Sequence, residues 1–398
     1  MEDLLYLVHR IPYPPNKGDK IRSYHLLKHL SRKYRVHLGA FVDDPADWQY
    51  ADEVRTLCGE TCLVGLNPGM ARLKSLTGLL TGKPLTLAYY SSAQLSSWVE
   101  KILKELPIKK TVIFSSAMAQ FVEGNSQLKR IADFVDVDSD KWRQYAPTKP
   151  WPLSWIYGRE GRALLSYERK VAARFDATLF VTEDEARLFR QLAPESAAKI
   201  GWFNNGVDFD FFSPDRDYPN PYAQDELPLV FTGAMDYWPN VDAVVWFARE
   251  VFPAIRNRFP NACFYIVGGQ PAPSVKLLTQ ISGVVVTGRV PDVRNHLAHA
   301  KMAVAPLRIA RGLQNKVLEA MAMAKPVVAS PQAAEGICAE AGKDLLVAAD
   351  AVAFQNIVTT LLKEGDARVG ESARRRVVAD YDWQNTLRRV DALLDDVV

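Results

Sequence analysis

The sequence predicts an α/β protein made of two doubly wound domains, each with a parallel sheet covered by helices. Three observations lead to this prediction. Short β-branched or apolar runs alternate with longer helical periodicities along the chain, which is typical of βαβ units. At 398 residues the chain is longer than a single hydrophobic core usually supports. A segment rich in turn-forming residues, 204–222, separates two such alternations.

The first half of the chain contains predicted strands joined by predicted helices. The strands are expected at Leu4–His9, Arg35–Phe41, Thr111–Ser115, Ala132–Val137 and Thr178–Val181, and the helices at Lys20–Lys33, Leu95–Leu106 and Arg159–Arg174. Strands connected through helices run parallel, so their carboxyl ends should meet at one edge of a sheet.

After the turn-rich segment the same alternation begins again. Strands are expected at Leu229–Thr232, Phe264–Val267, Val284–Thr287 and Ala303–Ala305, and helices at Val241–Phe259, Val293–His299, Ala351–Lys363 and from about Trp383 to Asp395. We therefore expect an N-terminal Rossmann-like domain at 1–203, a C-terminal one at 204–380, and a closing helix at 381–398 that packs back toward the first domain. Two such domains joined by one hinge would face a cleft.

Composition narrows the functional classes. No run reaches about 18 apolar residues, and the start Met1-Glu2-Asp3 is acidic and followed by only a short apolar run, so neither a membrane span nor a signal peptide is predicted. We expect a cytoplasmic protein whose four cysteines are buried free thiols, because no histidine stands at a metal-binding spacing from Cys58 and Cys62. Residues 1–200 carry a net charge of +6 and residues 201–398 one of −3, which suggests different partners for the two halves.

The most informative stretch is 312–330. It joins a glycine-bearing loop at Gly312, a short helix that begins near Asn315, and a β-branched strand after Pro326. Unpaired backbone N–H groups and the helix dipole at such a helix start attract a diphosphate. The carboxylate of Glu319, one turn further on, could accept hydrogen bonds from a ribose diol. An ordinary amphipathic αβ unit is the alternative.

Three glycine-bearing turns follow predicted strands: Gly18, Gly233 and the pair Gly268-Gly269. Glycine lets the backbone approach a ligand closely, although each could equally be a plain turn. None forms a GxGxxG fingerprint, and there is no P-loop, which disfavours NAD enzymes and Walker ATPases.

These motifs, taken in order, resemble the donor-binding half of GT-B glycosyltransferases. The matching stretches are Phe231–Met235, Tyr265–Gly269, Val286–Val290, Ala305–Leu307 and Asn315–Ala322. More narrowly they resemble the group 1 (family 4) retaining transferases, in particular the sugar transferases of exosortase (PEP-CTERM) exopolysaccharide systems. The first half agrees through its Pro-Pro-x-x-Gly turn at Pro14–Gly18, through Asp136–Trp142 and, at the hinge, through Asn205–Asp208.

The resemblance implies a transfer of sugar from a nucleotide diphosphate sugar to a lipid-linked or growing oligosaccharide acceptor, with retention, in exopolysaccharide or cell-surface polysaccharide synthesis. Glu319 matches the second Glu of the family's Glu-x7-Glu motif, which binds the ribose. The first Glu is replaced by Arg311, so we expect Arg311 to act in catalysis by neutralising the leaving diphosphate together with Arg308 and Lys316. Arg289 is a further candidate, because the turn after Gly233 lacks the basic pair of many relatives. For the arginines and Lys316, a solvated surface position is the alternative.

In the acceptor half the resemblance points to Asp138, which matches a region where relatives place a catalytic or acceptor-orienting polar group. Ser115 and Ser116, which end another strand, are similar candidates, and Lys17 and Gly18 belong to the acceptor side. For Asp138 and Ser139 a helix N-cap is an equal alternative. The sequence Asp136-Val137-Asp138 matches an Asp-x-Asp metal motif but lies in the wrong half for a metal-dependent transferase. No metal and no other cofactor are therefore expected. No nucleic acid partner is expected either.

A last feature is a basic surface with apolar and aromatic residues. The segment Met70–Tyr90 carries Arg72, Lys74 and Lys83 among leucines, and Trp151, Trp155, Tyr157, Arg159 and Arg162 follow later. Such a surface suits an interfacial helix in peripheral contact with anionic lipid, for example at the inner face of the cytoplasmic membrane. An ordinary amphipathic helix is the alternative.

Two other functions fit the same fold. A nucleotide-sugar 2-epimerase would need catalytic carboxylates and histidines gathered in the cleft, and the six histidines are not obviously gathered there. A degenerate protein that binds a sugar nucleotide without catalysis is kept open by Arg311.

Overall fold

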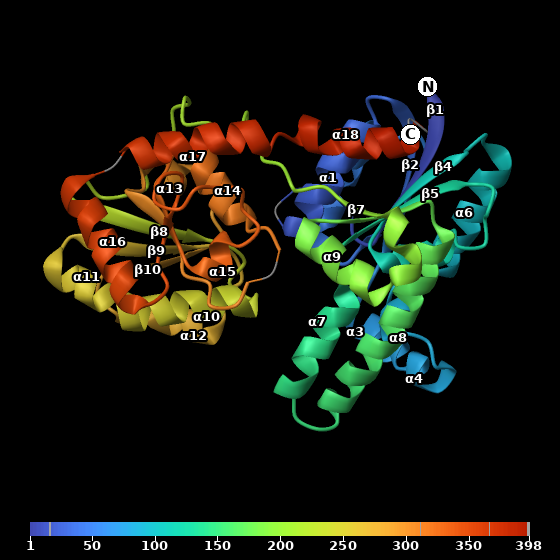
Figure 1. The fold of residues 1–398 in the computed structure, drawn as a ribbon, viewed down its shortest axis with the longest axis horizontal. Coiled ribbons are helices and arrows are strands. Elements are labelled where there is room, and N and C mark those ends of the chain that lie inside the picture. The colour runs from blue at the N-terminus through green and yellow to red at the C-terminus, as the bar shows by residue number, and fades with distance from the viewer. Residues whose placement is uncertain (16, 311, 366, 396–398) are drawn as a thin grey trace. The chain divides into compact units, whose positions relative to one another are not determined.

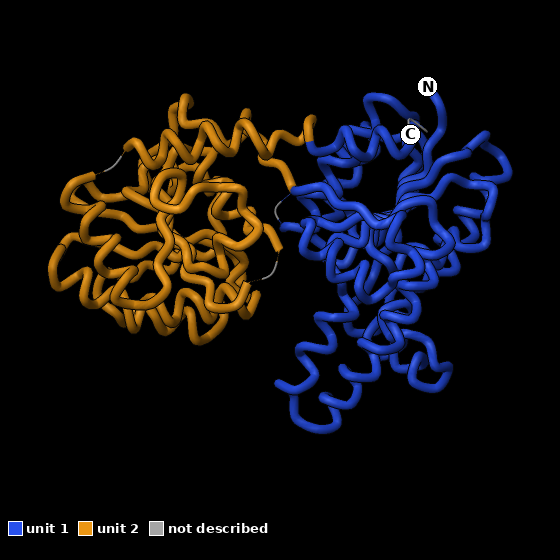
Figure 2. Tube along the Cα trace, viewed as in Figure 1, with its two compact units in different colours: residues 1–204, 386–398 blue, residues 205–385 orange. Residues whose placement is uncertain are grey.

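The computed structural model describes residues 1–15, 17–310, 312–365 and 367–395. It divides into two compact units, residues 1–204 with 386–398 and residues 205–385 (Figure 2). Each unit is a parallel sheet flanked by helices (Figure 1), so the predicted doubly wound α/β class is confirmed. The division lies one residue from the hinge position expected from the sequence and five residues beyond the expected end of the second domain.

Unit 1 contains a seven-stranded sheet in the order β3-β2-β1-β4-β5-β6-β7. Its strands are β1 (Glu2–Val8), β2 (Tyr34–Val42), β3 (Thr61–Gly65), β4 (Lys110–Phe114), β5 (Lys129–Val135), β6 (Ala177–Phe180) and β7 (Ile200–Trp202). Its helices are α1 (Gly18–Leu30), α2 (Ala51–Thr56), α3 (Pro68–Ser75), α4 (Thr77–Thr81), α5 (Leu85–Tyr89), α6 (Ala93–Glu105), α7 (Asp138–Tyr145), α8 (Leu153–Arg174) and α9 (Glu183–Leu192), with short 3-10 turns at Pro45–Tyr50, Ser116–Phe121, Ala146–Thr148 and Pro194–Lys199.

Unit 2 contains a six-stranded sheet in the order β10-β9-β8-β11-β12-β13. Its strands are β8 (Leu227–Thr232), β9 (Ala262–Val267), β10 (Val284–Gly288), β11 (Met302–Ala305), β12 (Val327–Ala329) and β13 (Leu346–Val347). Its helices are α10 (Trp238–Trp246), a π-helical turn at Phe247–Val251, α11 (Phe252–Arg258), α12 (Pro273–Lys276), a 3-10 turn at Leu277–Gln280, α13 (Val293–His299), α14 (Asn315–Ala322), α15 (Pro331–Ala334), α16 (Ala351–Glu364) and α17 (Ala367–Asp380).

The last helix, α18 (Trp383–Leu394), begins in unit 2 and continues in unit 1. Within unit 1 it is held by polar contacts to the end of α1 and the start of β2. Asp391 pairs with His29 at 2.9 Å and with Lys33 at 2.6 Å, and the Tyr34 hydroxyl donates to Asp395 at 2.8 Å. These contacts fix the end of the described chain on unit 1.

Two sequence expectations need correction. The segment Met70–Tyr90 is not one helix, because Gly82 adopts a left-handed φ of 74° and Pro84 follows it, which breaks the chain into α3, α4 and α5. The cysteines are free, as expected, but Cys338 is exposed and Cys58 is only partly buried.

A buried ion pair connects α1 to the middle of the sheet in unit 1. The Arg22 side chain is fully buried, and its Nε and Nη2 donate to the Asp133 carboxylate on β5 at 2.7 and 3.0 Å. Its Nη1 donates to the carbonyl of Phe203 at 2.8 Å, and the guanidinium lies 3.5 Å from the centre of the Phe203 ring. Burial raises the pKa of Asp133, and the charge and hydrogen bonds of Arg22 oppose this shift, so the buried carboxylate depends on its partner.

Replacing Arg22 with Met should destabilise unit 1 by about 3–5 kcal/mol, because Asp133 would remain buried without its partner. Urea unfolding followed by circular dichroism measures the change. Arg169→Met is the matched control: its pair with Glu195, at 2.8 Å, is exposed, so its loss should cost less than about 1 kcal/mol. Equal effects of the two substitutions would contradict this account of the pair.

Candidate functional site

The strand order of the sheet in unit 2 reverses between β8 and β11. The chain progresses from β8 outward in both directions, so the connections leaving β8 and β11 run to opposite sides of the sheet. In open parallel sheets, ligands bind outside the carboxyl ends of the strands at such a switch point. The loops that follow β8 and β11 begin at Gly233 and Pro306, and the second loop leads into α14.

The turns after β8 and β9 are in direct backbone contact. The N–H of Gly233 donates to the carbonyl of Val267 at 3.0 Å, and the N–H of Met235 donates to that of Gly269 at 2.9 Å. A Cβ at position 268 would lie 1.7 Å from the carbonyl oxygen of Gly233. Only glycine fits there, which explains the glycine that the sequence places after each strand.

A cation reaches the β8 turn from α14. Lys316 Nζ donates to Asn240 Oδ1 at 2.7 Å, and Asn240 Nδ2 donates to the carbonyl of Ala234 at 2.9 Å. A Cβ at Gly233 would lie 3.5 Å from Lys316 Cε. Lys316 therefore places its charge beside the turn after Gly233, where the sequence itself has no basic pair. Burial lowers the pKa of Lys316 to about 8.

Glu319 lies one turn further along α14. Burial raises the pKa of its carboxyl group to about 7, and the charge of Lys316 only partly opposes this. Among the residues that the structure describes, no hydrogen-bond donor to the Glu319 carboxylate is found. The group is partly buried and can accept hydrogen bonds from a ligand.

The start of α14 offers backbone N–H groups as well. Gly312 adopts a left-handed φ of 64°, which turns the loop into the helix, and the N-cap residue Gln314 makes no side-chain hydrogen bond to the first turn. Asn315 Oδ1 accepts a hydrogen bond from Asn205 Nδ2 at 3.2 Å. The N–H groups of this turn and the helix dipole provide positive potential beside Lys316.

The predicted arginines of unit 2 have different surroundings. Arg308 is half exposed and forms an ion pair with Asp242, its Nε donating at 3.0 Å, so its charge is already neutralised. Arg289 is exposed, and its Cβ lies 3.7 Å from the position of a Cβ on Gly269. Arg311, the predicted catalytic arginine, lies outside the described residues.

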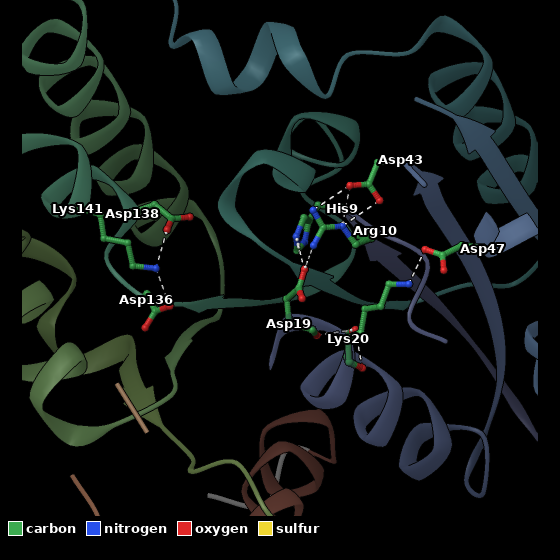
Figure 3. A network of polar contacts seen from close by, with 10 residues as sticks. His9, Arg10, Asp19, Lys20, Asp43, Asp47, Asp136, Asp138 and Lys141 are labelled. Carbon is green, nitrogen blue, oxygen red and sulfur yellow. Dashed lines mark hydrogen bonds and ion pairs between the residues drawn. The ribbon is translucent and has the colours of Figure 1, made fainter. Parts of the chain in front are cut away.

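In unit 1 the corresponding switch point lies between β1 and β4. Figure 3 shows Arg10, just after β1, between two carboxylates: Asp19 at 2.5 Å and Asp43, just after β2, at 2.9 Å. His9 Nε2 lies 3.4 Å from Asp19. Burial opposes ionisation of Asp19, but the hydrogen bond from His9 and the charge of Arg10 outweigh it and hold the pKa of Asp19 well below its usual range. The adjacent Lys20 pairs with buried Asp47 at 2.5 Å.

A second polar group lies after β5 (Figure 3). Lys141 Nζ contacts Asp136 at 2.7 Å and Asp138 at 3.2 Å. Burial alone would lower the pKa of Lys141, but the two carboxylates raise it. The two aspartates thus share an ammonium. Neither Asp138 nor Ser139 is the N-cap residue of α7, because that position is occupied by Val137. The N–H of Val137 donates to the Glu185 carboxylate at 2.7 Å.

The remaining predicted acceptor residues lie at the same edge of the sheet. Ser116 is buried at the start of the turn after β4, behind Ser115 with its left-handed φ of 76°. Gly18 begins α1, and Lys17 is the N-cap residue before it, both exposed. Across the described ranges no group of three or more His, Cys, Asp or Glu side chains is placed to hold a metal ion.

Sequence reasoning missed Asn240 in unit 2 and the group His9, Arg10, Asp19 and Asp43 in unit 1. A usable signal was present for the latter, because His9-Arg10 and Asp43 directly follow two strands that pair in parallel. Asn240 had no such signal, since only the fold of α10 brings it to Lys316.

Comparison with known proteins agrees with this geometry. Residues 226–364 match the family described as glycosyl transferases group 1. No curated protein matches the chain. Among solved structures, sucrose-phosphate synthase from Thermosynechococcus elongatus is 16% identical with a TM-score of 0.72, over 100% of this chain and 99% of that one.

Two further structures show the same likeness. Anabaena HepE in complex with UDP is 14% identical with a TM-score of 0.69, over 100% of both chains. WaaG, a glycosyltransferase involved in lipopolysaccharide biosynthesis, is 15% identical with a TM-score of 0.65, over 98% of this chain and 99% of that one. At these identities the likeness establishes the GT-B fold.

The contact between the two turns predicts that Gly268→Ala destabilises unit 2 by roughly 3 kcal/mol or more, because the new Cβ collides with backbone rather than with a movable side chain. Thermal unfolding measures the loss. Gly288→Ala is the control: its φ is also left-handed, 68°, but no atom lies within 4 Å of the new Cβ, so about 1 kcal/mol is expected. A loss no larger than that of the control would refute the close contact.

The raised pKa of Glu319 predicts a pH-dependent stability. The folded state favours the protonated carboxyl, so the penalty for ionising it accumulates as pH rises from the ordinary pKa of 4.5 to about 7 and is complete above that, on the order of 3 kcal/mol. The Tm of wild type should therefore fall relative to that of Glu319→Gln between pH 5 and pH 8.

The same substitution at Glu364, an exposed residue at the end of α16, is the control and should leave the Tm unchanged across this range. A constant Tm difference between wild type and Glu319→Gln would show that the Glu319 carboxyl is not desolvated in the free protein.

Proposed function

We propose that this protein is a group 1 glycosyltransferase that transfers a sugar from a nucleotide diphosphate sugar to a lipid-linked or growing glycan. The family match over residues 226–364 and the GT-B fold support this proposal. The observation that carries the proposal is the pair Lys316 and Glu319 at the switch point of unit 2. A desolvated ammonium and a desolvated carboxylate one turn apart match the two ends of a nucleoside diphosphate.

The donor's ribose would bind to Glu319. A ribose diol offers two O–H donors, and the ionised Glu319 carboxylate supplies acceptors that nothing else in the described part of the chain uses. Hydrogen bonds to an ionised acceptor are the stronger kind, and binding would compensate the desolvation of Glu319.

The diphosphate would bind between the β8 turn and the start of α14. Glycine at 233 and 268 lets the turns after β8 and β9 pack against each other and against Asn240, while Lys316 and the first turn of α14 provide positive charge. The same groups would stabilise the leaving diphosphate as the glycosidic bond of the donor breaks. In this proposal no metal or other cofactor takes part.

The acceptor would bind to unit 1. Arg10, Asp19, Asp43 and the Asp136–Asp138–Lys141 group present charged and polar atoms at the carboxyl ends of adjacent strands, where glycan hydroxyls could bind. Retention at the anomeric carbon and a cytoplasmic role in exopolysaccharide synthesis are further parts of the proposal, and both rest on the sequence resemblance. That HepE has been crystallised with UDP and with UDP-glucose, and that WaaG acts in lipopolysaccharide biosynthesis, supports this class of donor and product.

A thermal-shift panel of UDP, GDP, ADP and their common sugar conjugates tests the donor site. One nucleotide should raise the Tm, because a ligand that binds only the folded state stabilises it, by about 2.7 kcal/mol at 100 times its Kd. The shift should disappear in Glu319→Ala and persist in Glu364→Ala, which removes an exposed glutamate elsewhere in unit 2.

A second readout separates transfer from epimerisation. With the stabilising nucleotide sugar and a glycan acceptor, a transferase releases one nucleoside diphosphate for each sugar moved, whereas an epimerase interconverts the sugar and releases none. Absence of any nucleotide-induced shift in wild type would refute the donor site.

A further inference from the structure

Large apolar side chains are exposed together on one part of unit 1. Leu80 is 91% exposed, Trp151 82%, Met70 73% and Leu73 71%. Leu76, Leu153 and Trp155 are also exposed. These seven residues, called the apolar surface below, come from two segments: α3–α4, and the end of the α7–α8 turn with the first turn of α8. Single exposed apolar residues are normal on proteins, but a group of this size marks an interaction site.

The two segments are held together by one pair of neighbouring residues on α8. Arg159 donates to the carbonyls of Gly78 at 2.7 Å and of Lys83 at 3.0 Å. The fully buried Glu160 accepts from the N–H groups of Leu85 at 2.7 Å and Thr86 at 3.0 Å. The segment α3–α5 is therefore fixed on the first half of α8, and Figure 1 shows α3, α4 and the α7–α8 hairpin projecting on the same side of unit 1.

The position of Leu73 in α3 makes its side chain point outward. Ala71 and Ser75 are its buried residues, four positions apart on the inner face, whereas Arg72, Leu73 and Lys74 between them are exposed. The outer face therefore carries an apolar side chain between two cations rather than the polar residues typical of a solvated helix.

The two segments that carry the apolar surface contain charges of one sign. No Asp or Glu occurs between Glu60 and Glu100, or between Asp140 and Glu160. Arg72, Lys74, Lys83 and Lys149 lie in these intervals and are exposed. A surface that combines exposed leucine and tryptophan with lysine and arginine, and lacks acidic groups, is complementary to a bilayer with anionic headgroups.

We propose that the apolar surface docks unit 1 onto an anionic lipid bilayer. The tryptophans and leucines enter the boundary between headgroups and acyl chains, and the four cations bind the headgroups. Over the described ranges, no helix is long and apolar enough to cross a membrane, so this contact is peripheral. The role of this docking rests on the proposed function: it would bring unit 1, which binds the acceptor, to the bilayer that holds a lipid-linked acceptor.

Vesicle flotation with the full chain tests the proposal. Wild type should float with vesicles of phosphatidylcholine and phosphatidylglycerol, mixed about 3:1, and at least tenfold more weakly with phosphatidylcholine alone or at high salt. Leu80→Glu/Trp151→Glu should lose at least tenfold in binding. Val352→Glu, at a side chain that is 62% exposed on α16 of unit 2, is the matched control and should bind as wild type.

The cations need a separate variant. Arg72→Ser/Lys74→Ser/Lys83→Ser should lose the preference for phosphatidylglycerol while keeping the weak binding to phosphatidylcholine. On addition of anionic vesicles, the emission of wild type should shift to the blue as Trp151 and Trp155 leave water, and Leu80→Glu/Trp151→Glu should show little of this shift.

Several outcomes would overturn the proposal: no flotation of wild type, or unchanged flotation of Leu80→Glu/Trp151→Glu. A third is a wild-type dimer that this variant converts to monomer without any vesicle binding, because the surface would then be occupied by a second copy of the chain. The nucleotide thermal shift is measured without vesicles and should be the same in both variants, so failure of docking is distinguishable from failure of the donor site.

Discussion

Parallel strand pairing is the constraint on which both candidate sites depend. Every strand pair in the two sheets is parallel, so all strands of a sheet end at the same edge, and residues that follow different strands become neighbours. This is how Lys316 comes to lie beside the turn after Gly233, and how Arg10 comes to lie between Asp19 and Asp43. The site at each edge is assembled from residues that the sequence separates widely, and the helices that start there add their dipoles.

The buried charges of the two units illustrate two opposite uses of burial. Arg22 donates to Asp133 and to two backbone carbonyls, so the hydrogen bonds of this pair are already made in the free protein. Lys316 donates one hydrogen bond, to Asn240, and Glu319 has no hydrogen-bond donor among the described residues. Burial lowers the pKa of Lys316 and raises that of Glu319. A ligand with a diol and a negatively charged diphosphate would supply what this second pair lacks. Perturbed groups of this kind gather at functional sites. Burial also raises the pKa of Asp133, but that carboxylate already accepts from Arg22 within the fold, which marks the Arg22 pair as structural.

The sequence predicted most strands and long helices, because buried parallel strands are short β-branched runs and their helices have clear periodicity. It missed β3, β7 and β13, which are short or lie at sheet edges. For the surface that includes Met70–Tyr90 it suggested an interfacial or an ordinary amphipathic helix, since apolar spacing alone does not register the break at Gly82 and Pro84. Within the site, Glu319 and Lys316 could be predicted because a single motif carries them. The pairing of Arg308 with Asp242 and of Asp136 and Asp138 with Lys141 could not, because it depends on which side chains the fold brings together.

The apolar surface lies on parts of unit 1 that its sheet does not require. A single helix suffices to connect β3 to β4, and α6 does so; α3, α4 and α5 are additional. Likewise, the 22 residues of α8 extend about 33 Å, whereas the strand β5 with 7 residues spans about 23 Å. The first half of α8 and its partner α7 thus project beyond the layer that covers the sheet. A core-forming helix must bury its apolar residues. Helix α5 does so with Leu85 and Leu87, but α3, α4 and the start of α8 expose theirs beside cations. The Arg159 and Glu160 contacts hold the two additions together, which is expected of a surface with a common partner rather than of two unrelated insertions.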